Sequence, residues 1–329
     1  MQVVVVSPAA IDYAILPVET ALRQRGHEVI RYTDVSSFLA KADALAEADI
    51  LYCSNTPCGR ALLERAPKLR AVVTPWIGVE GFDIPAATAR GVVVANGQVA
   101  ENYLSMAEAT IMLVLACLYN LPEKIAALRN NEPPPPRQRA RMLRGKTLGM
   151  IGFGNMARAI ATRLANWEVK LQTYAPRLKT PLPPDVARVE LDALLRSSDI
   201  VCVLATLNAE TRGMLTLEKL RLMKPEAILV NTARGGIVEE RAICAIAEEG
   251  RLHKIALDVF ETEPLPKDSP LRGLPNMVLT PHALGHSREG GEAVPKIAVE
   301  NIRRALDGEP PLYVLNPEVL PAWRQRWAR

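Results

Sequence analysis

The sequence predicts an α/β protein of two domains, each built on a mainly parallel sheet. A length of 329 residues corresponds to two domains at about 150 residues per domain. Short β-branched runs alternate with helical patterns in two separate series along the chain, which is typical of βαβ units. Because these runs are continuously apolar, we expect strands that are covered by helices on both faces.

The first series of strands and helices lies before residue 101. We expect strands at residues 3–6, 29–32, 50–53, 69–73 and 92–95. We expect helices at residues 15–25, 44–48 and 59–66. Gly26 ends the first helix, because glycine is the usual residue just after a helical segment.

Residues 101–130 are predicted to form one long helix that is unusually apolar in its middle, where Glu108 is the one acid. A helix that is apolar all round must be buried, either in a core or against another subunit. Its most hydrophobic stretch, residues 111–119, is too short for a membrane span of about 20 residues. The prolines of Pro133–Pro136 cannot continue a helix, so we expect an extended surface connection, with a ligand for a proline-recognising protein as the alternative.

The second series begins at Lys146. We expect strands at residues 147–151, 169–174, 200–204, 227–231, 255–259 and 277–280. We expect helices at residues 155–165, 191–196, 216–222 and 239–248. A last helix, at about residues 291–307, follows the final strand and leads into a proline-containing tail.

Composition excludes several classes of protein. The formal charge of +4, from 40 basic and 36 acidic residues, is too small and dispersed for nucleic-acid binding, and aromatic residues are only 5%. Five cysteines without a CxxC pair fit neither a disulfide framework nor a zinc site, so we expect no metal. Reduced thiols and an N-terminus unlike a signal peptide favour a cytoplasmic protein, with no membrane partner.

A glycine motif opens the helix expected at residues 155–165. Residues 152–157 match GxGxxG/A and follow the predicted strand TLGMI, which is the context of a dinucleotide-binding turn. The first glycine permits a tight turn, the second lets a pyrophosphate approach the backbone, and the helix N-terminus attracts the phosphates. The predicted cofactor-binding residues of this turn are Gly152, Phe153, Gly154, Asn155 and Met156. A turn without a ligand is the alternative.

The acidic partner of this motif is missing. A site for NAD usually has Asp or Glu about 20 residues later, bonded to the ribose 2′-hydroxyl. Ala175 stands there instead, and Arg177 follows. Without the carboxylate, nothing repels a 2′-phosphate, and a guanidinium can pair with one. We therefore expect NADP(H), with NAD(H) possible; Arg177 as a solvated loop residue is the alternative.

Four further motifs carry a resemblance to a known family. They are NYLSMAE (Asn102–Glu108), NTARG (Asn231–Gly235), DVFETEP (Asp258–Pro264) and TPHALGHS (Thr280–Ser287). Together with the glycine motif, they resemble the D-isomer-specific 2-hydroxyacid dehydrogenases over nearly the whole chain. That family includes glyoxylate/hydroxypyruvate reductases, D-lactate dehydrogenases, phosphoglycerate dehydrogenases and formate dehydrogenase.

The resemblance implies a particular domain organisation. Residues 1–100 and 289–329 would form a flavodoxin-like substrate domain, and residues 101–288 an inserted Rossmann cofactor domain. The active site would lie in the cleft between them. The long helix after residue 100 would contribute to a homodimer, which would account for its apolar middle.

Three side chains match the family's catalytic set. Arg234 would pair with the substrate carboxylate or polarise the keto oxygen. His282, after a predicted strand, would donate the proton, since an imidazole exchanges protons near neutral pH. Glu263 would orient that imidazole and favour its charged form. His286 is a rival to His282, but the family places its histidine directly after Thr-Pro.

Other positions carry over from the family with less force. The backbone of Ile77 and Gly78 would bind the substrate carboxylate, and Asn102 would lie on the substrate side. Asp258 and Ala233 would lie near the nicotinamide. Thr206 stands where the family often has the proline of His-x-Pro, which leaves the adenosine-side contact uncertain. Trp76 replaces a smaller residue and would narrow the pocket, wall a larger substrate, or pack between domains.

The sequence therefore predicts an NADP(H)-preferring reductase of a small 2-keto acid such as glyoxylate or hydroxypyruvate. Two alternatives stay open. One is an NAD(H)-dependent dehydrogenase for a bulkier 2-keto acid. The other is a dinucleotide-sensing, corepressor-like binding protein, which would bind the cofactor but turn over little substrate.

Overall fold

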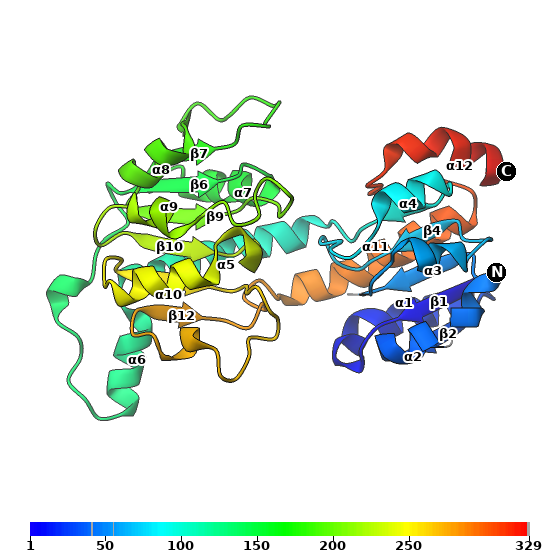
Figure 1. The fold of residues 1–329 in the computed structure, drawn as a ribbon, viewed down its shortest axis with the longest axis horizontal. Helices are drawn as coiled ribbons and strands as arrows, with labels where there is room; N and C mark the ends of the chain where they lie inside the picture. The colour runs from blue at the N-terminus through cyan, green and yellow to red at the C-terminus, as the bar shows by residue number, and fades with distance from the viewer. Residues whose placement is uncertain (41, 55, 328–329) are drawn as a thin grey trace. The chain divides into compact units, whose positions relative to one another are not determined.

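The computed structural model describes residues 1–40, 42–54 and 56–327. The chain divides into two compact units (Figure 1). The terminal unit comprises Met1–Asn102 and Ser287–Arg329, and the central unit comprises Tyr103–His286. Both divisions fall within two residues of the limits expected from the sequence.

The terminal unit is built on a five-stranded sheet in the order β2-β1-β3-β4-β5. Its strands are β1 (Gln2–Val6), β2 (Glu28–Tyr32), β3 (Ile50–Cys53), β4 (Ala71–Val73) and β5 (Val93–Ala95). All neighbouring strands pair in parallel. This is the flavodoxin-like order, so the expected fold of this unit is confirmed.

Helices cover both faces of this sheet. Alternate residues of β1 belong to two separate apolar clusters, Val4 and Val6 to one and Val3 and Val5 to the other. One face packs against α2 (Val35–Ala40), α3 (Arg60–Glu64) and α4 (Ile84–Ala89). The other face packs against α1 (Asp12–Gln24), α11 (Arg288–Leu306) and α12 (Leu320–Trp327).

The central unit is built on a seven-stranded sheet in the order β12-β11-β10-β9-β6-β7-β8. Its strands are β6 (Thr147–Ile151), β7 (Lys170–Tyr174), β8 (Val186–Arg188), β9 (Ile200–Val203), β10 (Ile228–Asn231), β11 (Lys254–Leu257) and β12 (Met277–Leu279). All pairs are parallel, and the strand order reverses between β6 and β9. This is the Rossmann arrangement, in which ligands bind outside the carboxyl ends of the strands at the reversal.

Two helical layers enclose the seven-stranded sheet. One apolar cluster joins the sheet to α5 (Ala100–Leu118) and α7 (Asn155–Leu164). The opposite cluster joins it to α8 (Leu191–Ser197), α9 (Leu217–Arg221) and α10 (Glu240–Glu248). The continuous apolar runs of the strands follow from this double cover.

The prediction of one helix over residues 101–130 is wrong. The segment forms α5 and a separate helix, α6 (Leu121–Arg129). Asn120 lies between them in the left-handed conformation, with φ 50° and ψ 45°, which stops the first helix. Pro122 then stands in the first turn of α6, where a proline needs no N–H partner.

Some shorter elements also differ from the expectation. The helix expected at residues 44–48 is a 3₁₀ segment, Ala42–Ala46, and the expected tail after residue 307 carries α12. The sequence reading missed α2 and α4, which have six residues each, and β8, which has three. Segments this short show too few turns or alternations for a periodic pattern.

By length and composition alone, the 19-residue helix α5 is apolar enough to cross a membrane. The stretch 111–119 considered in the sequence covers only the last eight residues of this helix and the residue after it. Its residues Ala107, Leu113 and Val114 are buried in the core of the central unit. The core helices of globular proteins pass the same test, so the apolar middle of α5 is accounted for in part by this packing.

Candidate active site

Three neighbouring strands of the central unit carry the predicted catalytic residues. Arg234 follows β10, Glu263 follows β11, and His282 follows β12. Because β10, β11 and β12 are parallel neighbours, their carboxyl ends lie at one edge of the sheet. The fold therefore brings these three loops to the same edge.

His282 and Glu263 form a direct pair. The imidazole Nδ1 lies 2.6 Å from Glu263 Oε2, and the carboxylate accepts a hydrogen bond from the Nδ1–H group. The other carboxylate oxygen, Oε1, accepts the N–H of Phe260 at 2.9 Å. His282 has a φ of 52°, a left-handed conformation that costs a residue with a side chain about 1–2 kcal/mol. The surrounding contacts thus hold both partners in one arrangement.

The environment of Glu263 keeps its carboxylate charged. Burial opposes ionisation, but the hydrogen bonds from His282 and Phe260 outweigh it. The positive charges of His282 and Arg234 act in the same direction, so the pKa of Glu263 lies below its ordinary value. A charged carboxylate accepts a hydrogen bond from the Nδ1–H group, which leaves Nε2 of the ring for a reacting molecule.

Arg234 lies in a loop with little freedom. Its carbonyl accepts the side-chain amide of Asn231 at 2.9 Å, and its Nη1 donates to the carbonyl of Ala233 at 2.7 Å. The neighbouring Gly235 packs directly on the next loop, where a Cβ would lie only 1.9 Å from the carbonyl carbon of Phe260. Glycine is therefore required for the loops of Arg234 and Glu263 to approach each other.

Asp258, predicted near the nicotinamide, also anchors the histidine loop. Its side chain is buried, and its Oδ1 accepts the hydroxyl of Thr280 at 2.7 Å. The same oxygen accepts the N–H groups of Ala283 and Leu284 at 3.2 and 3.3 Å. These donors flank His282, so this carboxylate stabilises the unusual backbone of the histidine.

The glycine turn has the geometry that its motif predicts. Gly152 has a φ of 98°, and a Cβ there would meet the backbone of Ala205 at 2.8 Å. Gly154 is the N-cap of α7, and Asn155 and Met156 form the first turn of that helix. Phe153 is buried, with the guanidinium of Arg158 5.1 Å from the centre of its ring. The turn therefore leaves backbone at the positive end of a helix, as a phosphate site requires.

The loop after β7 contains the residues expected to select the cofactor. Ala175 is buried at the end of this strand, where an NAD site would carry an acid. Arg177 is 67% exposed and forms an ion pair with Glu210 from the loop after β9. Thr206, on that same loop, uses its carbonyl to accept the hydroxyl of Thr211 at 2.7 Å. The predicted phosphate-binding guanidinium thus has a competing carboxylate beside it.

The terminal unit holds the predicted carboxylate-binding loop after β4. The carbonyl of Ile77 accepts the amide of Asn96 at 3.0 Å, and Trp76 Nε1 donates to Ser54 Oγ at 2.6 Å. Within the described part of the chain, no hydrogen bond uses the N–H groups of Ile77 and Gly78. Asn102 lies at the start of α5, in the same unit. Two unused N–H groups in succession suit an anion.

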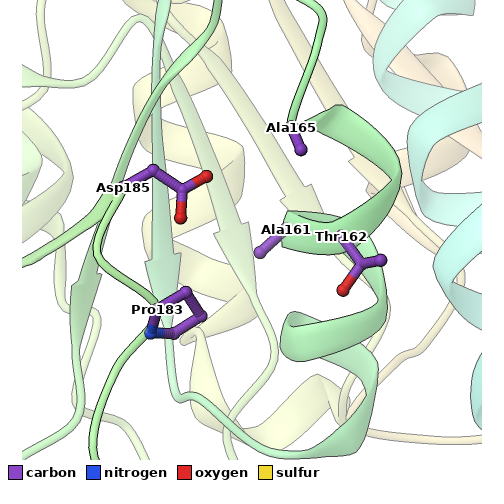
Figure 2. A pocket seen from close by; sticks show the side chains of 5 residues that line it. All are labelled: Ala161, Thr162, Ala165, Pro183 and Asp185. Atoms are coloured by element: carbon purple, nitrogen blue, oxygen red, sulfur yellow. The ribbon is translucent and has the colours of Figure 1, made fainter.

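A hollow of about 260 Å³ lies elsewhere on the central unit. Figure 2 shows its lining, which comes from α7 and from the segment before β8. Ala161 and Thr162, near the end of α7, and Ala165, just after it, lie at the end of the helix farthest from the glycine turn. The hollow is therefore separate from the phosphate end of this helix, and we assign it no catalytic role.

Sequence reasoning missed the residues that hold the catalytic loops in place. They are Gly235, Phe260, Glu261 and Thr280. Each acts through backbone geometry or a contact to a distant segment, which a motif does not reveal. The pair of consecutive glycines after Arg234 was the one available signal of close packing.

A dinucleotide-binding turn and a paired histidine at neighbouring strand ends define an oxidoreductase with a nicotinamide cofactor. The family model for the D-isomer specific 2-hydroxyacid dehydrogenase, NAD binding domain, matches residues 111–283. The chain belongs to this family, and it is an NAD(P)-dependent 2-hydroxyacid dehydrogenase or reductase.

Individual relatives are similar over most of the chain. A D-3-phosphoglycerate dehydrogenase from Methanocaldococcus jannaschii is 35% identical over 305 residues, but the chain spans only 57% of that longer protein. Glyoxylate/hydroxypyruvate reductase B from Escherichia fergusonii is 33% identical over 95% of this chain and 99% of its own length. The crystal structure of an NADPH-dependent glyoxylate/hydroxypyruvate reductase from Sinorhizobium meliloti has a TM-score of 0.82 and 25% identity, covering 98% of this chain and 99% of the other.

Proposed function

We propose that this protein reduces a small 2-keto acid, of the glyoxylate or hydroxypyruvate type, to the D-2-hydroxy acid and prefers NADP(H). The observation that carries this proposal is the hydrogen bond between His282 Nδ1 and Glu263 Oε2, next to the charge of Arg234. A reductase of this substrate class is 33% identical over 95% of the chain, which supports the choice of substrate.

The residues present fit a dinucleotide. Gly152, where a Cβ would overlap Ala205, allows the tight turn, and nothing lies within 4 Å of a Cβ placed on Gly154, which leaves room for phosphate at the N-terminus of α7. Ala175 and Arg177 fit a 2′-phosphate better than a free 2′-hydroxyl, since no acid follows β7 directly. Ala233 and Asp258, at the ends of β10 and β11, would lie near the nicotinamide. When bound, the cofactor supplies the hydride.

The chain's own residues would supply the proton and bind the acid. In the central unit, Arg234 would bind the substrate carboxylate. In the terminal unit, the N–H groups of Ile77 and Gly78 suit an anion, and they and Asn102 are our candidate contacts to the substrate in that unit. His282 would donate its Nε2 proton to the keto oxygen as that oxygen gains charge. The carboxylate of Glu263 would balance the imidazolium before the transfer and keep the ring oriented.

Turnover with NADPH and NADH against glyoxylate, hydroxypyruvate, pyruvate and phenylpyruvate tests the reaction, followed by the absorbance of the reduced nicotinamide. We expect rapid NADPH oxidation with glyoxylate or with hydroxypyruvate. Cofactor binding without turnover of any acid would contradict the proposal and favour a binding protein instead.

The cofactor preference has its own test in the pair of Arg177 and Glu210. We expect Arg177→Ala to raise the KM for NADPH about tenfold, because a charge-assisted contact to the 2′-phosphate is lost. The KM for NADH should stay nearly unchanged. Glu210→Gln removes the competing carboxylate and should lower the KM for NADPH. An equal effect of Arg177→Ala on both cofactors would overturn the NADP preference.

A specific observation favours the alternative of NAD(H) and a bulkier 2-keto acid. The ion pair of Arg177 with Glu210 cancels the charge that would attract a 2′-phosphate. Trp76 meanwhile offers an indole held by Ser54, which would suit an aromatic or branched side chain. A preference for NADH and phenylpyruvate in the same assay would establish this alternative.

We also propose a cytoplasmic homodimer formed through α5 and α6. A groove of about 390 Å³ is lined by α5 and by Arg163, Leu164 and Trp167, and apolar side chains lie exposed around it. Met112 and Trp167 of this groove are exposed, and further exposed apolar residues lie at the end of α5 and on α6, namely Tyr119, Leu121, Ile125 and Leu128. A second copy is the occupant that we expect, because exposed apolar groups that gather on a surface are typical of an interface. The free thiols favour a reducing compartment.

Analytical ultracentrifugation tests the dimer. Leu128 is 85% exposed, so packing inside the monomer does not account for an apolar side chain at this position. We expect Leu128→Asp to shift the protein toward a monomer, whereas Leu16→Asp, on an exposed site of the terminal unit, should leave its mass unchanged. A monomeric parent protein at assay concentration would refute the interface.

A further inference from the structure

The turn that carries Glu263 is tied to a second element besides the glycine loop. Glu240 is the first residue of α10, and its N–H donates to Glu261 Oε1 at 2.9 Å. The N–H of Glu261 donates to Glu240 Oε1 at 2.7 Å. The two residues therefore exchange hydrogen bonds between side chain and backbone across 21 positions of sequence.

This exchange serves the helix as well as the turn. The first N–H groups of a helix have no partner within it, and the helix dipole favours a negative group there. Glu261 accepts the N–H of the first residue of α10 and places a carboxylate at the start of the helix. The arrangement resembles a capping box in which the two residues come from different segments of the chain. The buried side chains of α10, including Ala242, Ile243 and Ile246, fix the helix on the sheet. The turn is thereby fastened to a rigid element.

The fastened residue lies inside the turn that orients the catalytic carboxylate. Phe260 donates its N–H to Glu263 Oε1, and Glu261 lies between these two residues in the chain. On its other side, the turn touches Gly235 through the backbone of Phe260. Besides the exchange at Glu261, the turn is held by this contact and by the buried side chain of Phe260.

We propose that Glu240 and Glu261 are positioning residues for the Glu263–His282 pair, acting through their reciprocal hydrogen bonds. The inference rests on the proposed function for the reaction it affects, but the geometry that carries it is independent of the substrate. By holding the turn, the exchange keeps Glu263 Oε2 at hydrogen-bond distance from the imidazole.

Charge does not explain this arrangement. Burial and the neighbouring charge of Glu261 raise the pKa of Glu240. Arg241, the cation on the same turn of α10, pairs with Glu239 instead. The hydrogen bonds therefore form despite repulsion between two carboxylates, so the acceptor geometry of Glu240 matters more than its charge. An amide at this position should replace it well.

Two substitutions at Glu240 separate geometry from charge. Glu240→Asp keeps the charge and suits a helix start, but its acceptor is one methylene too short to reach the N–H of Glu261. Glu240→Gln keeps the acceptor at full length and removes the charge. We expect Glu240→Asp to lower kcat for keto-acid reduction about fivefold, as for loss of one hydrogen bond, and Glu240→Gln to retain the parent value. The control is Glu239→Gln, which removes the neighbouring carboxylate and should change nothing.

The pH profile gives a readout that a merely structural role would not move. In a looser Glu263–His282 pair, the pKa of Glu263 should rise toward its ordinary value, so the acid limb of the Glu240→Asp profile should move to higher pH. A lower melting temperature with an unchanged profile would overturn the proposal. So would a Glu240→Gln variant as impaired as Glu240→Asp.

A measurement without substrate distinguishes failure of this inference from failure of the proposed function. An imidazole N–H bonded to a carboxylate gives a proton resonance at unusually low field, here from Nδ1 of His282. We expect this resonance in the parent protein and in Glu240→Gln, and its broadening or loss in Glu240→Asp. An intact resonance in Glu240→Asp overturns the positioning role, even if the parent protein reduces none of the acids tested.

Discussion

The two units present their candidate groups in different ways. The central unit offers charged side chains, and each of them is held by a further contact. Glu263 is fixed by Phe260, and the loop of His282 is fixed by Asp258. The terminal unit offers backbone N–H groups at Ile77 and Gly78, in a loop held by one amide and one indole.

This difference matches two functions, proton exchange and anion binding, which place different demands on the structure. Side chains that exchange a proton must keep a defined distance and charge, so several contacts hold them in place. A pair of backbone N–H groups needs only the right local conformation to attract an anion. Substitutions in the central unit should therefore act mainly on kcat, and substitutions in the terminal unit on KM and substrate choice.

The largest effect is expected at His282. His282→Ala removes the proposed proton donor and should lower kcat for reduction about 10²–10⁴-fold, the usual contribution of general acid catalysis. Steady-state kinetics with the preferred keto acid measures this loss. His286→Ala is the matched control, because it removes an exposed histidine four positions later and should keep near-parent activity. If the two variants lose activity equally, the assignment of the acid fails.

The next effect separates two adjacent glycines. Gly235→Ala would force a Cβ to within 1.9 Å of the backbone of Phe260, so the turn of Glu263 must move. We expect a loss of about 1–3 kcal/mol in the free energy of unfolding, together with a lower kcat. In Gly236→Ala, the Cβ would lie 3.2 Å from the flexible side-chain end of Arg212 and at ordinary contact distance, 3.6 and 3.7 Å, from Leu207, so this variant should be tolerated. Equal denaturation curves for both variants would contradict the close approach.

The same contrast explains how far the sequence could predict the molecule. The order and type of nearly all strands followed from continuous apolar runs, because double-covered parallel strands leave that pattern. The break between α5 and α6 did not, since Asn120 adopts its left-handed conformation through local geometry that composition does not reveal. The short strand β8 has only Val186 buried, which is too little for a pattern.

The candidate site was predictable where chemistry needs particular side chains. Motifs pointed to Arg234, Glu263 and His282, and the fold brings their strand ends together. The contacts that hold them were not predictable, because Gly235 and Glu261 act on segments more than 20 positions away. The ion pair of Arg177 with Glu210 was hidden for the same reason: it joins the loops of two strands that are not consecutive in the chain.

In the terminal unit, the sharpest test is Trp76. If its indole narrows the space for the substrate, Trp76→Ala should raise kcat/KM for phenylpyruvate relative to glyoxylate about tenfold, with kcat for glyoxylate little changed. Ser54→Ala removes the hydrogen-bond acceptor of the indole but keeps the ring, so a smaller shift is expected. A fall in the same ratio would instead identify Trp76 as a wall for a larger substrate.

The smallest effect concerns the charge of Glu263. Because its pKa is lowered in the folded protein, the carboxylate stabilises the fold above about pH 4.3, the ordinary value for Glu. That contribution is lost as the pH falls through the lowered pKa. Its side chain is 33% exposed, so solvent screens the pair, and we expect Glu263→Gln to cost only about 0.5 kcal/mol at pH 7. Denaturant unfolding of both proteins at pH 7 and at low pH measures the difference, which should vanish in acid. If the difference in the free energy of unfolding persists at low pH, Glu263 stabilises the fold through its shape and not through its charge. The conclusion that the central unit depends on a charged carboxylate would then lose its support from stability.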